Sequence, residues 1–313
     1  MTVDVVIVTY NRIEKLQKAL SAYDKQTQLF RSLIVVNNNS TDGTADYLAK
    51  WNKTPSPYKK YVINLPENKG GAGGFYEGQT FALSLNPDWI YVSDDDAYPA
   101  IDMFEQFYSF CKKVETKTTA AICAIVKNMD NTIAYSHRGK IIMKKRIKMQ
   151  RTDITKQEYQ KETVRIDFLS YVGSFINSQA IKEVGICDPR FFIFYDDSEH
   201  SLRLTKFGPM FCCSNIIIHH DNASLKDYSD KSVLVTWTRY YHCRNHIQML
   251  KRHFFFSAIY ETLRYLYEGL SLTIKSYKNY PVLILTIIPL FDAWTNRLGM
   301  HKKYKPGFII HKK

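Results

Sequence analysis

Short apolar runs alternate with amphipathic stretches over the first hundred residues of the chain. Residues 3–9 form a near-continuous apolar run, which is typical of a strand buried on both faces of a parallel sheet. Residues 12–24 follow with apolar side chains at helical spacing, so they predict a helix with one buried face. The alternation continues, and it predicts strands at 3–9, 33–36, 61–63 and 89–92 and helices at 12–24, 44–51 and from a glycine-rich turn to residue 85.

This alternation also predicts the fold class. It indicates an α/β chain with a Rossmann-like, mostly parallel sheet and helices on both faces. Further strands are predicted at 120–126 and 216–218, whereas residues 141–165, rich in Lys, Arg, Gln and Thr, are expected to cover a sheet edge or form a mobile flap. In open sheets of this class ligands bind at the carboxyl ends of the strands, so the loops that follow strands are the candidate functional segments.

The last quarter of the chain differs in composition. Residues 231–313 are rich in Tyr, Phe and Leu, and they hold 14 of the 43 Lys and Arg residues but three of the 30 acidic ones. This segment therefore carries +11 of the net charge of +13. We divide the chain into a catalytic domain at 1–230 and a helical region at 231–313. The longest apolar run, 281–290, is shorter than the roughly 20 residues that span a bilayer.

A basic, aromatic and amphipathic segment is suited to an anionic membrane surface. The alternatives are an ordinary helical cap with a basic face, a contact between copies in a homo-oligomer, and nucleic-acid binding. Nucleic acid is the weakest of these, because no recognised nucleic-acid motif is present and long aliphatic stretches separate the basic residues. We expect the inner face of the cell membrane as a partner and no nucleic acid.

The cysteines and the N-terminus indicate the compartment. The six cysteines show no CxxC spacing, so the sequence predicts neither a zinc site nor a disulfide framework. The chain enters a strand-like run at residue 3, and this predicts no signal peptide. Both features indicate a cytoplasmic protein with reduced thiols.

An acidic triplet closes the strand predicted at 89–92. Asp94, Asp95 and Asp96 follow a buried run directly, and three adjacent carboxylates repel one another unless a cation lies among them. Oxygen ligands suit a hard divalent cation, and such ions usually share their coordination with substrate phosphates. The triplet therefore predicts a Mg²⁺ or Mn²⁺ site and a phosphate-containing substrate, the alternative being a solvated acidic turn.

Polar residues also follow the first two predicted strands. Thr9, Asn11 and Arg12 come after the first strand, and the turn at 37–44 comes after the second. Both strands end at one edge of the sheet, so these side chains should flank one crevice, where short polar groups suit a base and a ribose. Each cluster alone is a weak signal, since such residues are typical of turns.

Four glycines lie within five positions at 70–74, after the third predicted strand. Glycine permits positive φ and close backbone approach, so this loop is expected to face a ligand, with one or two of the glycines open to a role in helix–sheet packing. The segment is not a dinucleotide-binding fingerprint, because Tyr76 stands at the last glycine position. It is not a P-loop either, since that motif ends in Gly-Lys-Ser/Thr.

Two further clusters offer a base and a metal ligand. The aromatic run 191–195 leads into Asp196 and Asp197 at a predicted helix start, where one carboxylate could act as a general base or the pair could cap the helix. His219 and His220 end the strand predicted at 216–218. Adjacent strand residues point to opposite faces, so only one of these histidines can join the acidic triplet.

Taken in order, these segments resemble the family 2 glycosyltransferases of the GT-A fold. The opening strand motif at 8–12, the turn at 34–44 and the DxD metal motif at 94–96 resemble the family as a whole. The segments at 68–75 and 195–199 are most similar to the galactofuranosyltransferase branch. Residues 240–245 are similar to a YYxxRN stretch of that branch and of rhamnosyltransferases. The resemblance covers residues 3–245.

The resemblance implies an inverting, metal-dependent transfer from a nucleotide-sugar donor, a UDP-sugar. Mn²⁺ or Mg²⁺ would be held by Asp94, Asp96 and His219, with His220 as the other choice for the third ligand. The glycine loop and Trp89 would border the pocket. The residues that the resemblance implies for the donor are Thr9, Asn11, Arg12, Asn37, Asn39, Asn68, Gly70, Gly71 and Asp95.

The resemblance further implies that Asp197, or failing that Asp196, removes the proton from the acceptor hydroxyl. The sugar would be galactofuranose, or else rhamnose or another hexose, and the acceptor would be a lipid-linked glycan at a bacterial membrane. Where the family usually has Asp after the second strand this chain has Asn37, which leaves the nucleotide base open. Two rivals of other classes are a metal-dependent nucleotidyltransferase, for which Lys69 is the only cation near the glycine loop, and a non-catalytic basic binding module.

Overall fold

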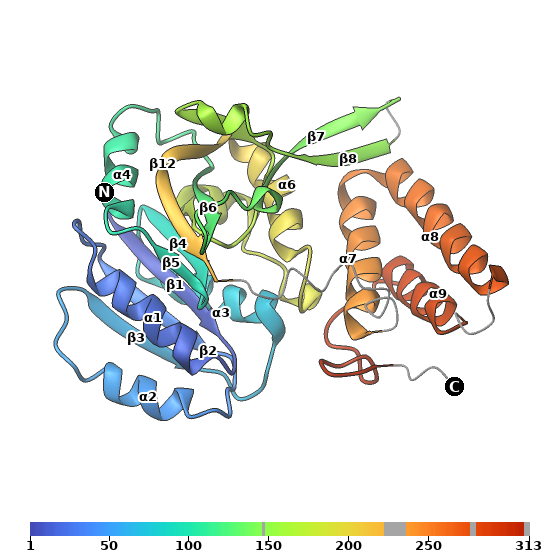
Figure 1. Cartoon of the computed structure of the whole chain (residues 1–313), viewed down its shortest axis with the longest axis horizontal. Helices are drawn as coiled ribbons and strands as arrows, with labels where there is room; N and C mark the ends of the chain where they lie inside the picture. Colours follow the sequence, from blue (N-terminus) through green and yellow to red (C-terminus); the bar gives the residue numbers. More distant parts are fainter. Residues whose placement is uncertain (146–147, 222–235, 276–279, 310–313) are drawn as a thin grey trace.

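The computed structural model describes residues 1–145, 148–221, 236–275 and 280–309. Figure 1 shows a part built on a sheet with its helices at the left and a group of three helices, α7 to α9, at the right. The predicted boundary between residues 230 and 231 lies outside the described residues.

A mixed sheet forms the core of the first part. Its strand order is β3-β2-β1-β4-β11-β6-β12-β5, with β9 paired to the other half of β12. The strands β3, β2, β1 and β4 are parallel neighbours, whereas β11 runs antiparallel between β4 and β6. The strands are β1 (Val3–Thr9), β2 (Ser32–Asn37), β3 (Lys59–Asn64), β4 (Trp89–Asp94), β5 (Ala97–Pro99), β6 (Ala121–Asn128), β9 (Thr163–Ile166), β11 (Ser174–Asn177) and β12 (Met210–His220).

Helices cover both faces of this sheet, as the alternation predicted. Alternate residues of β1 face opposite sides, so Ile7 packs in one core with α1, α2 and α4, and Val6 packs in the other with α3, α5 and α6. The helices are α1 (Ile13–Asp24), α2 (Thr44–Trp51), α3 (Gly70–Ser84), α4 (Met103–Cys111), α5 (Ser178–Val184) and α6 (Asp196–Phe207).

The basic segment 141–165 contributes to a second, three-stranded sheet. This sheet has the order β10-β7-β8, from β7 (Arg138–Lys144), β8 (Lys148–Asp153) and β10 (Phe168–Leu169). The β7–β8 pair projects from the body of the first part toward α8 (Figure 1). The segment is thus a projecting hairpin followed by the edge strand β9.

The C-terminal part is helical, with α7 (Trp237–His253), α8 (Phe255–Lys275) and α9 (Tyr280–Trp294). Among the described residues, none of the helices combines the length and the hydropathy needed to cross a bilayer. The helix α7 packs against α6 on one side and against α8 and α9 on the other. It therefore links the sheet-based part to the remaining helices.

One sequence expectation is wrong at this level. Trp89 was expected to border the pocket, but its side chain is 2% exposed and packs edge-on against Phe107 in the core. The reason is its place at the first residue of β4, at the opposite end of the strand from Asp94.

Candidate active site

A cavity of about 1310 Å³ opens at the carboxyl ends of β1 and β4. Its walls come from the strand ends, the start of α3, the hairpin strand β8, the first turn of α6, and α7. The acidic triplet and the Asp196–Asp197 pair both line this cavity. Residues more than a hundred positions apart in the sequence thus face one space.

The end of β1 holds the middle carboxylate of the triplet. The hydroxyl Oγ1 of Thr9 donates a hydrogen bond to Asp95 Oδ2 at 2.7 Å. The guanidinium of Arg12, just before α1, donates from Nη1 to Asp95 Oδ1 at 3.2 Å and to Asp96 Oδ2 at 2.6 Å. These partners occupy both carboxylate oxygens of Asp95 and orient it toward β1, and Arg12 also links it to Asp96.

The outer two carboxylates meet a histidine from β12. One ligand atom from each of Asp94, Asp96 and His220 lies within 4.8 Å of the others. Nε2 of His220 lies 3.1 Å from Asp96 Oδ1, and its buried Nδ1 has no hydrogen-bond partner among the described residues. Two carboxylates and one imidazole suit a divalent cation such as Mn²⁺ or Mg²⁺, so the residues present fit the ion that the sequence predicted.

The assignment of the third ligand therefore moves from His219 to His220. His219 lies on the other face of β12, where its Nε2 is 3.0 Å from Asn131 Oδ1. The alternation along a strand predicts that one of two adjacent histidines faces the site, but it cannot tell which one without the register of the strand. Pairing of His220 with Ala97 of β5 supplies that register.

Burial and mutual repulsion set the protonation of the triplet. Burial, and next to it the charge of Asp96, raises the pKa of Asp94 to about 7. Burial raises the pKa of Asp95 to about 6, against the opposing effect of Arg12. Burial acts on Asp96 as well, but the hydrogen bond with His220 and the charges of Arg12 and Lys15 outweigh it and lower the pKa of Asp96. A cation bound among these carboxylates would offset the repulsion by Asp96 that helps to raise the pKa of Asp94.

The glycine segment forms the first turn of α3 rather than a loop before it. Gly70 has φ +72°, and a Cβ there would lie 2.0 Å from the carbonyl oxygen of Phe192, so only glycine fits. Gly71 has open space around it and lines the cavity. Gly74, in contrast, packs against Val8 of β1. Two of the four glycines therefore face the ligand space, and close packing of α3 on the sheet accounts for Gly74.

The asparagines near the ends of β1 and β2 differ in whether they line the cavity. Asn38 lines the cavity, and its side chain donates to Asn68 Oδ1 and to the carbonyl of Gly70, both at 3.0 Å. Asn37 donates instead to Asn64 Oδ1 at 2.9 Å, Asn39 is exposed, and Asn11 accepts from the backbone of the turn at 2.7 Å. The latter three are not among the residues that line the cavity, and Asn38 is the amide that the sequence interpretation missed.

The aromatic run before α6 has a strained backbone. Phe192, Phe194 and Tyr195 have φ values of 66°, 64° and 65°, which bulky residues seldom adopt. Each costs about 1–3 kcal/mol and persists where the surroundings hold it. This segment, 192–195, is called the aromatic loop below. It leads directly into Asp196 and Asp197 in the first turn of α6.

Two residues of α7 hold the aromatic loop. The buried amide Nδ2 of Asn245 lies 2.9, 2.7 and 3.0 Å from the carbonyl oxygens of Phe191, Ile193 and Phe194. Arg244 donates to Asn245 Oδ1 at 2.9 Å and to the carbonyl of Phe191 at 3.1 Å. The Arg-Asn pair of the YYxxRN stretch thus serves as a clamp on the segment that carries the two carboxylates.

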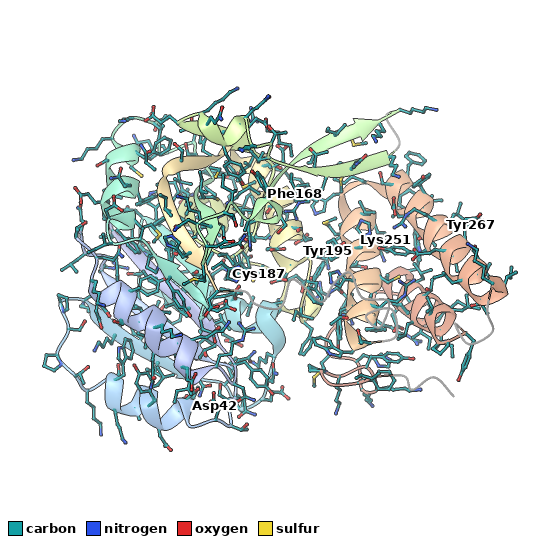
Figure 2. All side chains as sticks on the ribbon, in the orientation of Figure 1. Asp42, Phe168, Cys187, Tyr195, Lys251 and Tyr267 are labelled. Atoms are coloured by element: carbon teal, nitrogen blue, oxygen red, sulfur yellow. The ribbon has the colours of Figure 1, made fainter. Side chains whose placement is uncertain are left out.

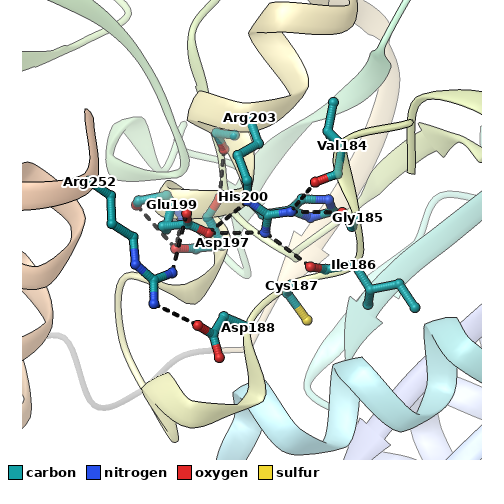
Figure 3. Close-up of polar contacts among 12 residues, drawn as sticks. Val184, Gly185, Ile186, Cys187, Asp188, Asp197, Glu199, His200, Arg203 and Arg252 are labelled. Carbon is teal, nitrogen blue, oxygen red and sulfur yellow. Dashed lines mark hydrogen bonds and ion pairs between the residues drawn. The ribbon is translucent and has the colours of Figure 1, made fainter. Parts of the chain in front are cut away.

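A buried ion cluster fixes the other side of α6 (Figure 3). Glu199 accepts from Arg203 Nε at 3.0 Å and pairs with Arg252 at 3.4 Å and with His253 at 3.1 Å. Arg252 also reaches Asp188, at 2.7 Å. Burial opposes the ionised form of Glu199, but the hydrogen bond with His253 and the charges of Arg203 and Arg252 lower its pKa to about 2. Since Arg252 and His253 end α7, this helix anchors the first turn of α6 from two directions.

The two carboxylates of α6 differ in their surroundings. Burial, together with the charge of Asp197, raises the pKa of Asp196 to about 8. Burial also raises the pKa of Asp197, but Arg151 and the bonds from Ser198 counter it. The backbone N–H and the hydroxyl of Ser198 both donate to Asp197 Oδ1. Asp197 is the more exposed of the two, so it is the better candidate for a base that faces the cavity.

Histidines of α7 complete an aromatic wall that no sequence signal indicated. His242 stacks on Phe194 at 3.9 Å between ring centres, and His246 stacks on Tyr195 at 5.1 Å. Burial lowers the pKa of both histidines to about 4, so they are neutral rings at neutral pH. Figure 2 shows Tyr195 between the sheet-based part and the helices, which is where this wall lies. The helical region is thus part of the site.

The sequence matches a known family over more than half of its length. Residues 4–185 match the family described as Glycosyl transferase family 2. Among curated proteins, the galactofuranosyltransferase GlfT1 of Mycolicibacterium smegmatis is 30% identical over 223 residues, which is 68% of this chain and 69% of that protein. GlfT1 of Mycobacterium tuberculosis strain H37Rv is 28% identical over 218 residues, with 68% of each chain covered.

Solved structures share the fold at much lower identity. TarS of S. aureus in complex with UDP-GlcNAc has a TM-score of 0.61 at 13% identity, covering 94% of this chain and 81% of that one. The mannosyltransferase PcManGT of Pyrobaculum calidifontis, in complex with GDP-Man and Mn²⁺, has a TM-score of 0.57 at 14% identity, covering 95% and 88%. These likenesses establish that the chain has the GT-A architecture, with helices appended to the mixed sheet.

Proposed function

Because this chain belongs to glycosyl transferase family 2, we propose that it transfers galactofuranose from UDP-galactofuranose to a hydroxyl group of a lipid-linked glycan. The choice of sugar rests on the similarity to GlfT1 over two thirds of both chains. The nucleotide-sugar donor and the cation accord with the UDP-GlcNAc of the TarS complex and the GDP-Man and Mn²⁺ of the PcManGT complex. The transfer takes place on the cytoplasmic face of a bacterial membrane.

One observation carries this proposal. Two groups face the same cavity. One is the cluster of Asp94, Asp96 and His220 at the strand ends, and the other is the carboxylate pair on α6. A glycosyl transfer needs a place for a diphosphate leaving group and, across the sugar, a base for the attacking hydroxyl. A nucleotidyltransferase would need cations around the glycine turn, but Lys69 is engaged there in an ion pair with Glu77 at 2.8 Å.

The chain's own residues perform the following roles. Asp94, Asp96 and His220 would hold Mn²⁺ or Mg²⁺, which when bound neutralises the charge that develops on the departing diphosphate. Thr9 and Arg12 keep Asp95 oriented toward β1, where it accepts from the donor. Asn38 fixes the turn of Gly70 and Gly71, along which the donor lies.

Asp197 removes the proton of the acceptor hydroxyl while the oxygen forms its bond to the anomeric carbon and the bond to UDP breaks. Attack from the face opposite to UDP inverts the anomeric centre. The aromatic wall of Phe194, Tyr195, His242 and His246 offers flat apolar surfaces next to Asp197, which suit the ring of an acceptor sugar.

The base is tested by Asp197→Asn with Asp196→Asn as its matched control. We expect Asp197→Asn to lower kcat for UDP formation by about 10²–10⁴-fold, the usual contribution of a general base. Asp196 is protonated at neutral pH because its pKa is raised to about 8, so its amide variant should lose far less. A full rate in Asp197→Asn, or a product that retains the donor's anomeric configuration by NMR, would contradict the mechanism.

A further inference from the structure

The helix α8 exposes an apolar face on the side away from α7 and α9. Its members repeat at intervals of four and three residues, so they form one stripe along the helix. All of them are exposed, among them Leu263 (62%), Tyr267 (75%) and Ile274 (84%), and Figure 2 shows Tyr267 pointing away from the body of the protein. The α8 face, as it is called below, consists of Phe256, Tyr260, Leu263, Tyr267, Leu270 and Ile274.

This face is too long and too apolar for an ordinary solvated helix. Its 19 residues span roughly 27 Å at 1.5 Å per residue. With Ile259 beside it, the stripe covers an arc of about 100°. The charged residues of α8 avoid it: Glu261 pairs with Arg264, and Arg264 with Glu268. A continuous exposed apolar stripe of this kind marks a surface that is covered in use.

The tip of the β7–β8 hairpin continues the α8 face. The backbone N–H of Met149 donates to Ser257 Oγ at 2.8 Å, and Lys148 Nζ lies 4.5 Å above the ring of Tyr260. The hairpin therefore lies against the start of α8, as Figure 1 also shows. Its end exposes two apolar side chains, Ile142 and Met143, followed by Lys144 and Lys145. Apolar side chains beside lysines suit a bilayer with anionic headgroups.

A second copy of the chain is the other candidate for this surface, because the 4–3 spacing is also that of a coiled coil. In a two-stranded coiled coil, β-branched residues are preferred at heptad position a. Two of the three a positions of this stripe hold Tyr260 and Tyr267. The flanking positions lack the complementary charges that specify a partner helix, since Arg264 is the sole charged residue there and is paired within the chain. Tyr is, in contrast, enriched where protein meets the headgroup region of a membrane.

We propose that the α8 face, together with the hairpin tip, docks the protein onto an anionic lipid bilayer. The inference rests on the proposed function, because docking on the membrane lets a lipid-linked acceptor reach the site while its lipid stays in the bilayer. The cavity reaches the hairpin and the side of α8 next to this face, where Lys144 and Lys148 of the hairpin and Glu261 and Arg264 of α8 line it. Headgroup phosphates meet the lysines, and the apolar stripe enters the boundary between headgroups and acyl chains.

The test replaces three residues that make no packing contact in the core, in the variant Leu263→Gln/Tyr267→Gln/Ile274→Gln. Its matched control, Leu29→Gln/Ile101→Gln/Met129→Gln, changes three exposed apolar residues of the sheet-based part. Flotation with vesicles of phosphatidylcholine, with and without phosphatidylglycerol, measures binding. We expect the full chain to bind vesicles that contain phosphatidylglycerol, the α8 variant to bind at least about tenfold more weakly, and the control to bind as the unmodified chain does. Removing one charge in Lys145→Gln should weaken binding about fivefold.

Each other outcome overturns the inference. Equal binding of the α8 variant and the control, or no binding of the unmodified chain to anionic vesicles, removes the docking role. A dimer that becomes a monomer in the α8 variant, measured by analytical ultracentrifugation, assigns the face to self-association instead. Measuring UDP formation by each variant in the absence of vesicles separates this test from the test of the proposed function. Unchanged UDP formation with lost vesicle binding supports the docking face, and vesicle binding without any UDP formation refutes the proposed function alone.

Discussion

Replacing Asn245 by Ala removes the amide that holds the strained aromatic loop. This side chain is 0% exposed, and its Nδ2 lies 2.7–3.0 Å from three backbone carbonyls. Its two N–H groups satisfy buried acceptors whose loss costs about 1–3 kcal/mol each. Relaxation of one of the positive-φ residues returns about 1–3 kcal/mol, so part of that cost is recovered by a loop that has moved. We expect a net loss of about 2 kcal/mol of stability.

The movement matters more than the stability, because the loop leads into Asp196 and Asp197. A displacement of about 1 Å of a reacting group can cost about 10²-fold in rate, and we expect that loss in kcat of Asn245→Ala. Gln248→Ala is the matched control. Gln248 is also a buried amide of α7, but its Nε2 bonds Asn296 at 3.2 Å, away from the cavity. Thermal unfolding and steady-state UDP formation measure both variants. The reasoning is refuted if Asn245→Ala keeps its kcat, or if Gln248→Ala loses as much.

Three further predictions concern the cation, the glycine turn and pH. His220→Ala should weaken Mn²⁺ binding at least about 10-fold in titration calorimetry, whereas His219→Ala should not change it, and the reverse result would restore His219 as the ligand. Gly70→Ala should lower stability by at least about 2 kcal/mol in chemical denaturation, since φ is +72° and its Cβ would meet the carbonyl of Phe192, while Gly71→Ala, which meets nothing, should not. Activity should rise with pH as Asp197 loses its proton, because burial raises its pKa and the base acts as a carboxylate. Removing the hydroxyl that lowers the pKa of Asp197, in Ser198→Ala, should move this limb of the kcat profile to higher pH, and an unmoved limb would show that Asp197 does not control it.

The sequence was sufficient for the elements whose pattern is local. The apolar run at 3–9 and the helical spacing at 12–24 correspond to β1 and α1, because buried parallel strands and one-sided helices leave clear periodicities. The strands β5 and β11, with three and four residues, are too short to show a period, so the antiparallel members of the sheet were missed. The GT-A architecture came from the ordered motifs and not from periodicity.

The candidate site was predictable where the chemistry of the residues indicates one kind of ligand. The acidic triplet indicates a cation on charge alone, and both Asp94 and Asp96 lie in the cluster. The choice between His219 and His220, and between Asn37 and Asn38, depends on strand register and on turn geometry, which composition does not reveal. The clamp by Arg244 and Asn245 joins segments about fifty positions apart, so their role emerges only when α7 is packed against the aromatic loop.

The most direct test of the account follows UDP released from UDP-galactofuranose by the unmodified chain and by Asp96→Asn, each with Mn²⁺ and after chelation. The account predicts rapid release by the unmodified chain with Mn²⁺, loss of that release with chelator and recovery when Mn²⁺ is restored. It also predicts at least about 10²-fold slower release by Asp96→Asn, which lacks one carboxylate of the cation site. Equal rates with chelator, a full rate in Asp96→Asn, or faster release from UDP-glucose than from UDP-galactofuranose would contradict it.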